Sequence, residues 1–189
     1  MINDTIIKLL PNILSVLRIA LTPVCIFFLF KKIFLISLVI FLLASLTDFL
    51  DGYIARKYNS VSKIGAFLDP VADKMLVVGL FLSFYFLGII IDIYILIMII
   101  FRDVFVTILR IFMQLKGVTM ITSKISKLKT AIQFLVITII FIKLILEIGN
   151  SDKLIYIISL FMAVLTFYTG IHYLISNFSQ FFKLLKMGK

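Results

Sequence analysis

The chain has 189 residues, of which 63% are hydrophobic and 15% charged, and its mean hydropathy is +1.23. This composition excludes a water-soluble globular domain, because successive apolar runs of about 20 residues are long enough to cross a bilayer. The net charge of +10 does not indicate nucleic-acid binding, since most basic residues flank the ends of apolar runs, as expected of a membrane protein. Cys25 is the single cysteine and cannot form an intrachain disulfide.

Six apolar segments follow one another along the chain, and we predict a membrane-spanning helix for each. Their predicted bounds are 11–30, 33–57, 64–88, 92–115, 127–148 and 154–176. Pro11 suits a first helical turn, Gly88 is a typical C-terminal cap, and Asp92 is a typical N-cap. The sequence therefore predicts an all-α integral membrane protein, with residues 1–189 forming one domain, a bundle of six transmembrane helices.

Lysines in and beside the loops predict the orientation of this bundle in a cell membrane. Nine of them flank the second and third helices, flank the fourth and fifth helices, or lie in the C-terminal tail. The opposite side has only Lys31, Lys32 and Lys153. Because cytoplasmic loops are enriched in Lys and Arg, we expect the N and C termini to face the cytoplasm.

Several polar side chains of the predicted helices lie at a similar depth. With a rise of 1.5 Å per residue, Asp48, Asp73, Arg110 and His172 fall roughly 24 to 28 Å from the outer surface of a core about 30 Å thick. Arg18, roughly 20 Å from that surface, approaches the same layer. We therefore predict a polar cavity, and the active site, at the cytoplasmic side of the bundle.

Four aspartates lie in this otherwise apolar part of the chain. Asp48 and Asp51 are spaced i, i+3, and Asp69 and Asp73 are spaced i, i+4, so each pair lies on one helix face. Without counter-charges, desolvation and mutual repulsion would oppose their ionisation. Hard divalent cations prefer oxygen ligands, so the four aspartates predict a metal site able to hold a pyrophosphate. A capping role is common for one aspartate at a helix end, but it suits four at these spacings poorly.

Small and basic residues follow the first pair of aspartates. Gly52 and Ala55 would let a ligand approach the helix backbone, and Arg56 carries a forked donor that suits phosphate. Gly and Ala also serve helix packing in membranes, which is the competing interpretation for these two residues.

The order of these residues resembles the signature of the CDP-alcohol phosphotransferases. The signature positions are Asp48-x-x-Asp51-Gly52-x-x-Ala55-Arg56, eight residues, then Gly65-x-x-x-Asp69-x-x-x-Asp73. Segments outside it, including PNILSVLRIALTPV and KLKTAIQ, are similar to the phosphatidylglycerophosphate synthases of that family. The resemblance covers nearly the whole chain in collinear order.

The resemblance implies an enzyme of phospholipid biosynthesis. Such enzymes transfer the phosphatidyl group of CDP-diacylglycerol to glycerol 3-phosphate, which gives phosphatidylglycerophosphate and CMP. By resemblance, two divalent cations, Mg²⁺ or Mn²⁺, would be held by Asp48, Asp51, Asp69 and Asp73. Asp73 would also act as the catalytic base. The CDP site would comprise Gly52, Ala55, Arg56 and Gly65. The resemblance further implies a homodimer.

The signature is shared by enzymes with different acceptor alcohols, so the acceptor has to be inferred from other residues. Arg110 and Lys129 reach the aspartate layer, Arg18 and Lys127 can assist them, and a dianionic phosphate suits these cations. His172, the only histidine, is a further candidate at that depth. Ordinary positive-inside lysines are the competing interpretation for Lys127 and Lys129.

Two further polar features need partners inside the membrane. Arg102-Asp103 stands where the resembled synthases usually have Arg-Glu, and we expect the shorter acid to pair with a neighbouring arginine. Lys74 points to a different helix face from Asp73, and we expect a snorkelling or ion-paired side chain.

Two alternatives to glycerol 3-phosphate transfer remain open at this point. One keeps the chemistry and uses another acceptor, such as inositol phosphate or phosphatidylglycerol. The other is a divalent cation transporter, although the acids gather on two helices at one depth instead of lining a path through the membrane.

Overall fold

The apolar runs of the sequence form six α-helices in the part of the chain that the computed structural model describes, which is residues 2–58, 63–115 and 124–187. Side chains are described for residues 10, 12–48, 50, 68, 71–113, 129–149 and 151–177. In chain order the elements are α1 (Ile2–Phe30), α2 (Phe34–Tyr58), α3 (Lys63–Phe86), α4 (Ile93–Leu115), α5 (Lys124–Leu146), a short 3-10 helix η1 (Gly149–Ser151) and α6 (Asp152–Met187). The predicted all-α class is confirmed.

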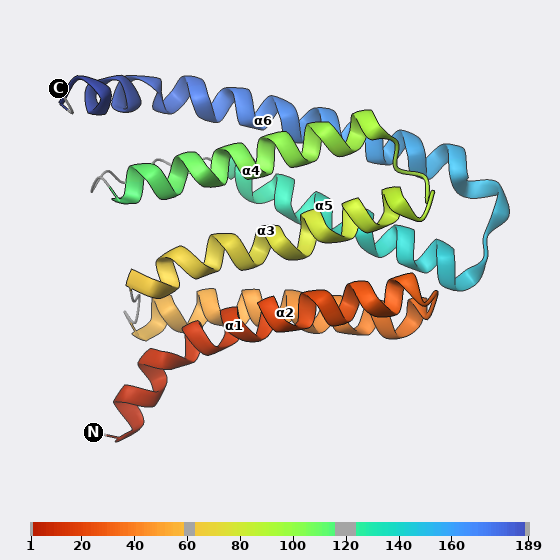
Figure 1. Ribbon diagram of the computed structural model, residues 1–189, viewed down its shortest axis with the longest axis horizontal. Coiled ribbons are helices and arrows are strands. Elements are labelled where there is room, and N and C mark those ends of the chain that lie inside the picture. The colour runs from red at the N-terminus through yellow and green to blue at the C-terminus, as the bar shows by residue number, and fades with distance from the viewer. Residues whose placement is uncertain (1, 59–62, 116–123, 188–189) are drawn as a thin grey trace.

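Two of these helices extend well beyond the predicted spans. α1 begins at Ile2 instead of residue 11, so Pro11 lies inside the helix and not in its first turn. Proline removes one backbone hydrogen bond and bends a helix, and Figure 1 shows the first turns of α1 leaving the bundle. α6 continues to Met187, since no glycine or proline interrupts it after Gly170.

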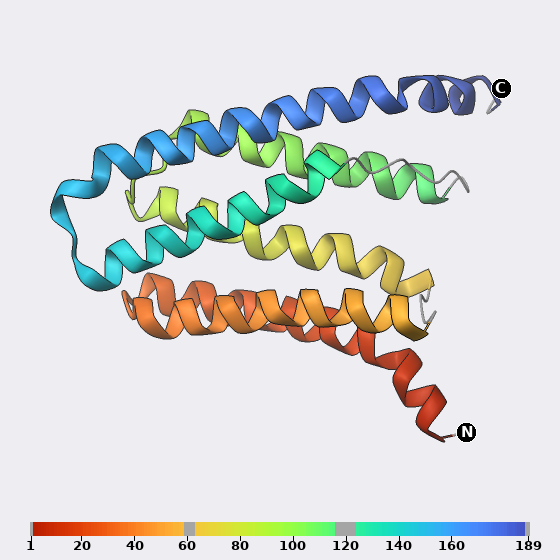
Figure 2. The same cartoon turned by 180° about the vertical axis from the view of Figure 1, so that it is seen from behind.

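The six helices run roughly along the long axis of the molecule (Figures 1 and 2). The start of α1 and the end of α6 lie at the same end of the bundle, as an even number of antiparallel passes requires. The connections 31–33, 87–92 and 147–151 all lie at the opposite end, which we call the turn end.

Each connection at the turn end contains a residue with a left-handed backbone, and the connection 87–92 contains two, because Ile90 has φ 55°. Gly88 has φ +67°, while Lys32 and Glu147 have φ values of 60° and 50°. At the end of α3, the N–H of Ile89 donates to the carbonyl oxygen of Phe84 at 2.8 Å, and the N–H of Gly88 donates to that of Tyr85 at 3.0 Å. This is a Schellman motif, so the capping role predicted for Gly88 is confirmed.

The core lies between the helices and is rich in phenylalanine. Phe141 of α5 packs against Phe84 of α3 and Phe41 of α2, with ring centroids 5.5 and 6.1 Å apart. Large apolar side chains also cover the outside, for example Phe161 at 65% exposed. Such a surface suits lipid and not water.

Among the described residues, three helical segments are long and apolar enough to cross a membrane. They are Asn12–Phe30, Lys129–Leu146 and Asp152–Asn177. Phe34–Asp48 of α2 is a shorter apolar helix. Together with the apolar outer surface, these segments identify a membrane protein.

Candidate active site

Two of the predicted aspartates meet one arginine between the first three helices. Nη1 of Arg18, on α1, lies 3.1 Å from Oδ1 of Asp48, on α2. The same atom hydrogen-bonds to Oδ1 of Asp73, on α3. Arg18 is buried, whereas the side chains of Asp48 and Asp73 are 35% and 32% exposed. Asp73 is 25 positions from Asp48 and 55 positions from Arg18 in the sequence, and the fold thus brings the three residues to one point.

The charges of this trio do not cancel. One guanidinium faces two carboxylates, which leaves a net charge of about −1 if all three are ionised. Both acids keep part of their surface open, so a further cation can reach them. Carboxylate oxygens from two helices already directed at a cation are the donor set that hard divalent ions prefer. The arrangement therefore fits a divalent cation.

The other signature residues lie on the same two helices, but their side chains fall outside the described part. Asp51, Gly52, Ala55 and Arg56 are on the last turns of α2, and Gly65 and Asp69 are on the first turns of α3. Lys127 lies on the first turn of α5, also without a described side chain. Among the side chains that are described, no three His, Cys, Asp or Glu residues gather in a group able to hold a metal.

A second polar cluster lies deeper in the bundle, around Asp103 of α4. Its carboxylate accepts hydrogen bonds from Nη1 of Arg102 at 2.9 Å, from Nε2 of Gln133 at 3.0 Å and from Nζ of Lys129. Nζ of Lys74 lies 3.8 Å from Oδ2 of Asp103. Asp103 and Lys129 are fully buried. The cluster joins α3, α4 and α5 through one carboxylate.

Parts of this cluster were predictable. The pairing of Asp103 with a neighbouring arginine and the ion-paired state of Lys74 are both confirmed. Lys129 was expected to bind an acceptor phosphate, and the structure places its ammonium on Asp103. The sequence did not predict Gln133 as a member of the cluster, because a single amide side chain in an apolar helix is common. Asp103 itself, an acidic residue within the apolar run of α4, indicated that a buried polar cluster would be present.

Arg110 and His172 lie on facing helices but have different surroundings. The guanidinium carbon of Arg110, on α4, is 5.9 Å from the ring centroid of Tyr173, on α6. Tyr173 is buried, whereas its neighbour His172 is exposed, with Nδ1 3.4 Å from Oγ of Ser176. Tyr173 and His172 therefore lie on different faces of α6. The roles of Arg110 and His172 at the acceptor site stay predictions.

An apolar groove of about 640 Å³ lies between α1, α3 and α4. Lys74, which follows Asp73 in sequence, is the only charged residue among the described residues that line it. From Lys74 the groove extends toward the turn end, past Gly79 and Ile26, and in the other direction to Val71 and Ile111. A Cβ on Gly79 would lie 3.0 Å from Cδ1 of Ile26, so this glycine lets α1 and α3 approach closely. The groove thus passes beside the carboxylate site and is lined mainly by apolar side chains.

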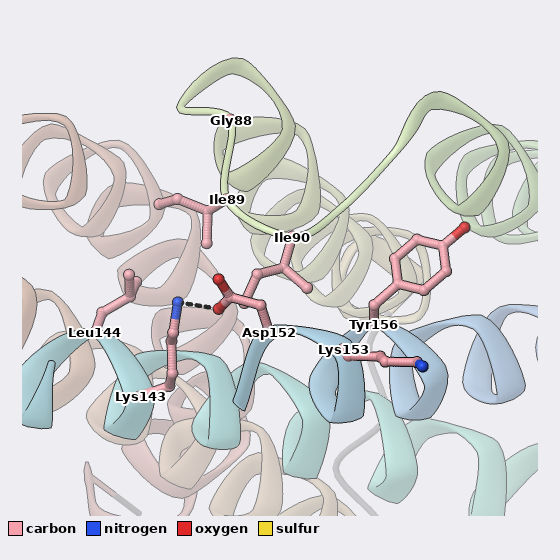
Figure 3. Close-up of a pocket in the computed structure, with 8 residues that line it drawn as sticks. All are labelled: Gly88, Ile89, Ile90, Lys143, Leu144, Asp152, Lys153 and Tyr156. Carbon is pink, nitrogen blue, oxygen red and sulfur yellow. Dashed lines mark ion pairs between the residues drawn. The ribbon is translucent and has the colours of Figure 1, made fainter. Parts of the chain in front are cut away.

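Another pocket, of about 420 Å³, opens at the turn end (Figure 3). Lys143 of α5 and Asp152 at the start of α6 point toward one another there and form an ion pair. Oη of Tyr156 donates to Oδ2 of Asp92 at 2.7 Å, and Asp92 caps α4 by accepting from the N–H of Ile95 at 2.9 Å. Of the predicted site residues whose side chains are described, none lines this pocket.

Comparison with known proteins agrees with the signature in the sequence. The family model described as CDP-alcohol phosphatidyltransferase matches residues 8–170. The chain belongs to this family. The match covers the Arg18 site and the whole Asp103 cluster of this phosphatidyltransferase, while His172 lies just beyond it.

Several curated relatives of this phosphatidyltransferase bear the name CDP-diacylglycerol--glycerol-3-phosphate 3-phosphatidyltransferase. The Cereibacter sphaeroides protein is 40% identical over 142 residues, which cover 70% of this chain and 63% of that protein. The Wigglesworthia glossinidia brevipalpis protein is 45% identical over 135 residues, 68% of this chain and 74% of its own length. The Rickettsia typhi protein is 39% identical over 136 residues, covering 70% and 76%. The aligned part thus spans roughly two thirds to three quarters of these relatives.

A relative with another name shares a shorter part of this phosphatidyltransferase. The cardiolipin synthase (CMP-forming) of Rattus norvegicus is 47% identical over 75 residues, 39% of this chain and 25% of the rat protein. Proteins with different enzyme names thus share strong local identity with this chain.

Proposed function

We propose that this chain transfers the phosphatidyl group of CDP-diacylglycerol to glycerol 3-phosphate, giving phosphatidylglycerophosphate and CMP. The observation that carries the proposal is the meeting of Asp48 and Asp73, from two helices, at one point inside a membrane bundle. Relatives named for this reaction, 39% to 45% identical over about 70% of the chain, support the same donor and acceptor.

The reaction is an in-line displacement at the phosphorus that carries the diacylglycerol. A hydroxyl oxygen of glycerol 3-phosphate forms the new bond to this phosphorus, and the bond to the oxygen of CMP breaks. CMP leaves with the electron pair, and a carboxylate oxygen of Asp73 takes the hydroxyl proton as general base. Positioning and charge neutralisation are the main requirements of such a transfer.

The chain supplies a donor set for the charge neutralisation. Asp48, Asp51, Asp69 and Asp73 would hold two divalent cations, Mg²⁺ or Mn²⁺, whose charge offsets that of the pyrophosphate and of the departing CMP. The net negative charge around Arg18 and the partial exposure of both described acids support this assignment. Gly52, Ala55, Arg56 and Gly65 would contact the CDP moiety.

The lipid part of the donor requires an apolar surface that reaches the carboxylates. The groove between α1, α3 and α4 supports this, because Lys74 in its lining directly follows Asp73 and most of its other described lining residues are apolar. We assign the acyl chains of CDP-diacylglycerol to this groove. The soluble acceptor would arrive from the opposite, aqueous direction.

The arrangement in the membrane follows from the same proposal. All six α-helices would cross the bilayer as one domain, with both termini, the polar cavity and the active site on the cytoplasmic side. The shared end of α1 and α6 supports an even number of crossings. By family resemblance the enzyme would be a homodimer.

Phosphatidylglycerol is the second candidate acceptor, because the rat cardiolipin synthase shares the 75-residue segment. An assay of CMP release by purified protein separates the acceptors. With CDP-diacylglycerol and Mg²⁺, we expect release with glycerol 3-phosphate, none with inositol phosphate or phosphatidylglycerol, and none after chelation of divalent cations. Release with another acceptor would keep the carboxylate site and change the substrate, whereas metal flux through liposomes without CMP release would indicate a transporter.

A further inference from the structure

The cluster around Asp103 contains more positive than negative charge. Lys74, Arg102 and Lys129 surround a single carboxylate, so the net charge is about +2 if all four groups are ionised. Lys129 and Asp103 are fully buried, and Arg102 is nearly so. An isolated ammonium at this depth would be strongly disfavoured, and the contact with the carboxylate of Asp103 offsets part of the cost of burying Lys129.

The cluster is connected to the carboxylate site through α3. Asp73 and Lys74 are consecutive, so their side chains leave the helix about 100° apart. Asp73 contacts Arg18 of α1, and Lys74 approaches Asp103 of α4. The turn of α3 that presents Asp73 is therefore held from two sides by ion pairs of opposite polarity. Lys74 thus connects Asp103 to the turn of α3 that presents Asp73.

We propose that Asp103 is a positioning residue, which holds the ammonium groups of Lys129 and Lys74 where the phosphate of the acceptor is bound. The proposal rests on the proposed function. The one carboxylate keeps three cations together inside the membrane and leaves a surplus of about two charges, which matches a dianionic phosphate. Asp103 itself would touch no substrate.

The central test compares Michaelis constants for the two substrates in Asp103→Asn. We expect the KM for glycerol 3-phosphate to rise about 10- to 100-fold, because Lys129 loses its charge partner, while the KM for CDP-diacylglycerol changes less than about twofold. Asp103→Glu, which keeps the charge, should restore most of the affinity. Calorimetric binding of glycerol 3-phosphate to the same variants measures the effect without turnover.

Two further variants separate positioning from stability. Asp152→Asn removes an ion pair of the turn end by the same chemical change and should leave both KM values unaltered. In a double-mutant cycle, Asp103→Asn combined with Lys129→Met should raise the KM for glycerol 3-phosphate no further than the larger single change. The double variant contains no unpartnered ammonium of Lys129, so it can be measured even if Asp103→Asn does not fold.

Each outcome decides the proposal. Equal changes in both KM values, or a lowered melting temperature with an unchanged KM for glycerol 3-phosphate, would show a structural role only and overturn it. Additive effects in the cycle would also overturn it. Wild-type protein that releases no CMP with glycerol 3-phosphate would contradict the proposed function itself, and the role of Asp103 with it.

Discussion

Acid–base pairs occur both in the interior of the bundle and at its turn end, and they differ in burial. In the pair of Lys143 with Asp152, the acid is 62% exposed, whereas Asp103 and Lys129 are both 0% exposed. An exposed pair contributes little free energy, because water solvates each partner well when the pair is broken. A buried pair is costly to assemble and more costly to break. Buried polar groups in a membrane protein therefore need a reason beyond stability.

The interior itself contains two contrasting sites. Around Arg18 the negative charges exceed the positive ones, while around Asp103 the positive charges exceed the negative ones. The first surplus suits divalent cations and the second suits a phosphate. The turn-end pair of Lys143 and Asp152 is balanced. Unbalanced charge in the interior is therefore suited to binding a ligand, whereas the balanced pair at the turn end lies at the boundary with water.

The largest expected effect is the loss of the proposed general base. Asp73→Asn should lower the rate of CMP release by at least about 10²- to 10⁴-fold, because the amide can neither accept the hydroxyl proton nor hold a cation strongly. Asp152→Asn, the matched change at the turn end, should leave the rate unaltered. Equal rates for wild type and Asp73→Asn, measured by CMP release at saturating substrates, would remove Asp73 from the mechanism.

Loss of the guanidinium between the two acids should lower stability. Arg18→Met leaves Asp48 and Asp73 without their cation, and we expect the free energy of unfolding to fall by about 1–3 kcal/mol, since both acids are partly exposed. Added Mg²⁺ should recover part of this loss and stabilise the variant more than wild type. Denaturant unfolding in detergent, with and without Mg²⁺, measures both.

Lys143→Met is the control for that change at the turn end. Its partner Asp152 is mostly exposed, so the expected loss is below about 1 kcal/mol. Similar losses for the two variants would contradict the contrast between the interior and the turn end.

A smaller effect is expected where α6 packs against the Asp103 cluster. A Cβ on Gly170 would lie 2.6 Å from Cγ of Arg102, so Gly170→Ala should lower the free energy of unfolding by about 1–2 kcal/mol despite the better helix propensity of alanine. Gly149 has no neighbouring atom within 4 Å of such a Cβ. Gly149→Ala should therefore stay within about 0.5 kcal/mol, and thermal unfolding of the two variants compares them directly.

The smallest effect should come from filling the apolar groove. Val104→Trp should raise the KM for CDP-diacylglycerol roughly threefold to tenfold and leave that for glycerol 3-phosphate unchanged, because the added rings occupy space for the acyl chains. Val164→Trp, on α6 away from the groove, is the control. A rise in the KM for glycerol 3-phosphate alone would contradict our assignment of the groove.

Much of the fold was predictable because it depends on local patterns. The apolar runs predicted helices, and Gly88 predicted the end of α3 through its backbone freedom. The start of α1 was not predictable, since a proline is tolerated inside a helix that can bend. The extension of α6 depends only on the absence of a stop signal, which is weak information.

The candidate site was predictable in its residues but not in their partners. Helical rise gave the depth of Arg18, Asp48 and Asp73, which the structure brings together. Depth does not give the direction in which a side chain points. For this reason Arg18 was assigned to the acceptor phosphate, whereas its guanidinium contacts Asp48 and Asp73, and the exposed face of α6 on which His172 lies was not foreseen. Rotation of each helix is set by packing with distant segments, which one sequence does not reveal.

The ion pairs of Arg18 also bear on how the chain is made. Aspartate at the centre of a helix opposes entry into a bilayer by roughly 2.5–3.5 kcal/mol, and both α2 and α3 carry such residues. Arg18 lies on α1, which leaves the ribosome before α2 and α3. We expect this arginine to form ion pairs with Asp48 of α2 and Asp73 of α3 as these helices enter the membrane, so that integration needs no metal. The chain would thus carry its own provisional counter-ion during biosynthesis.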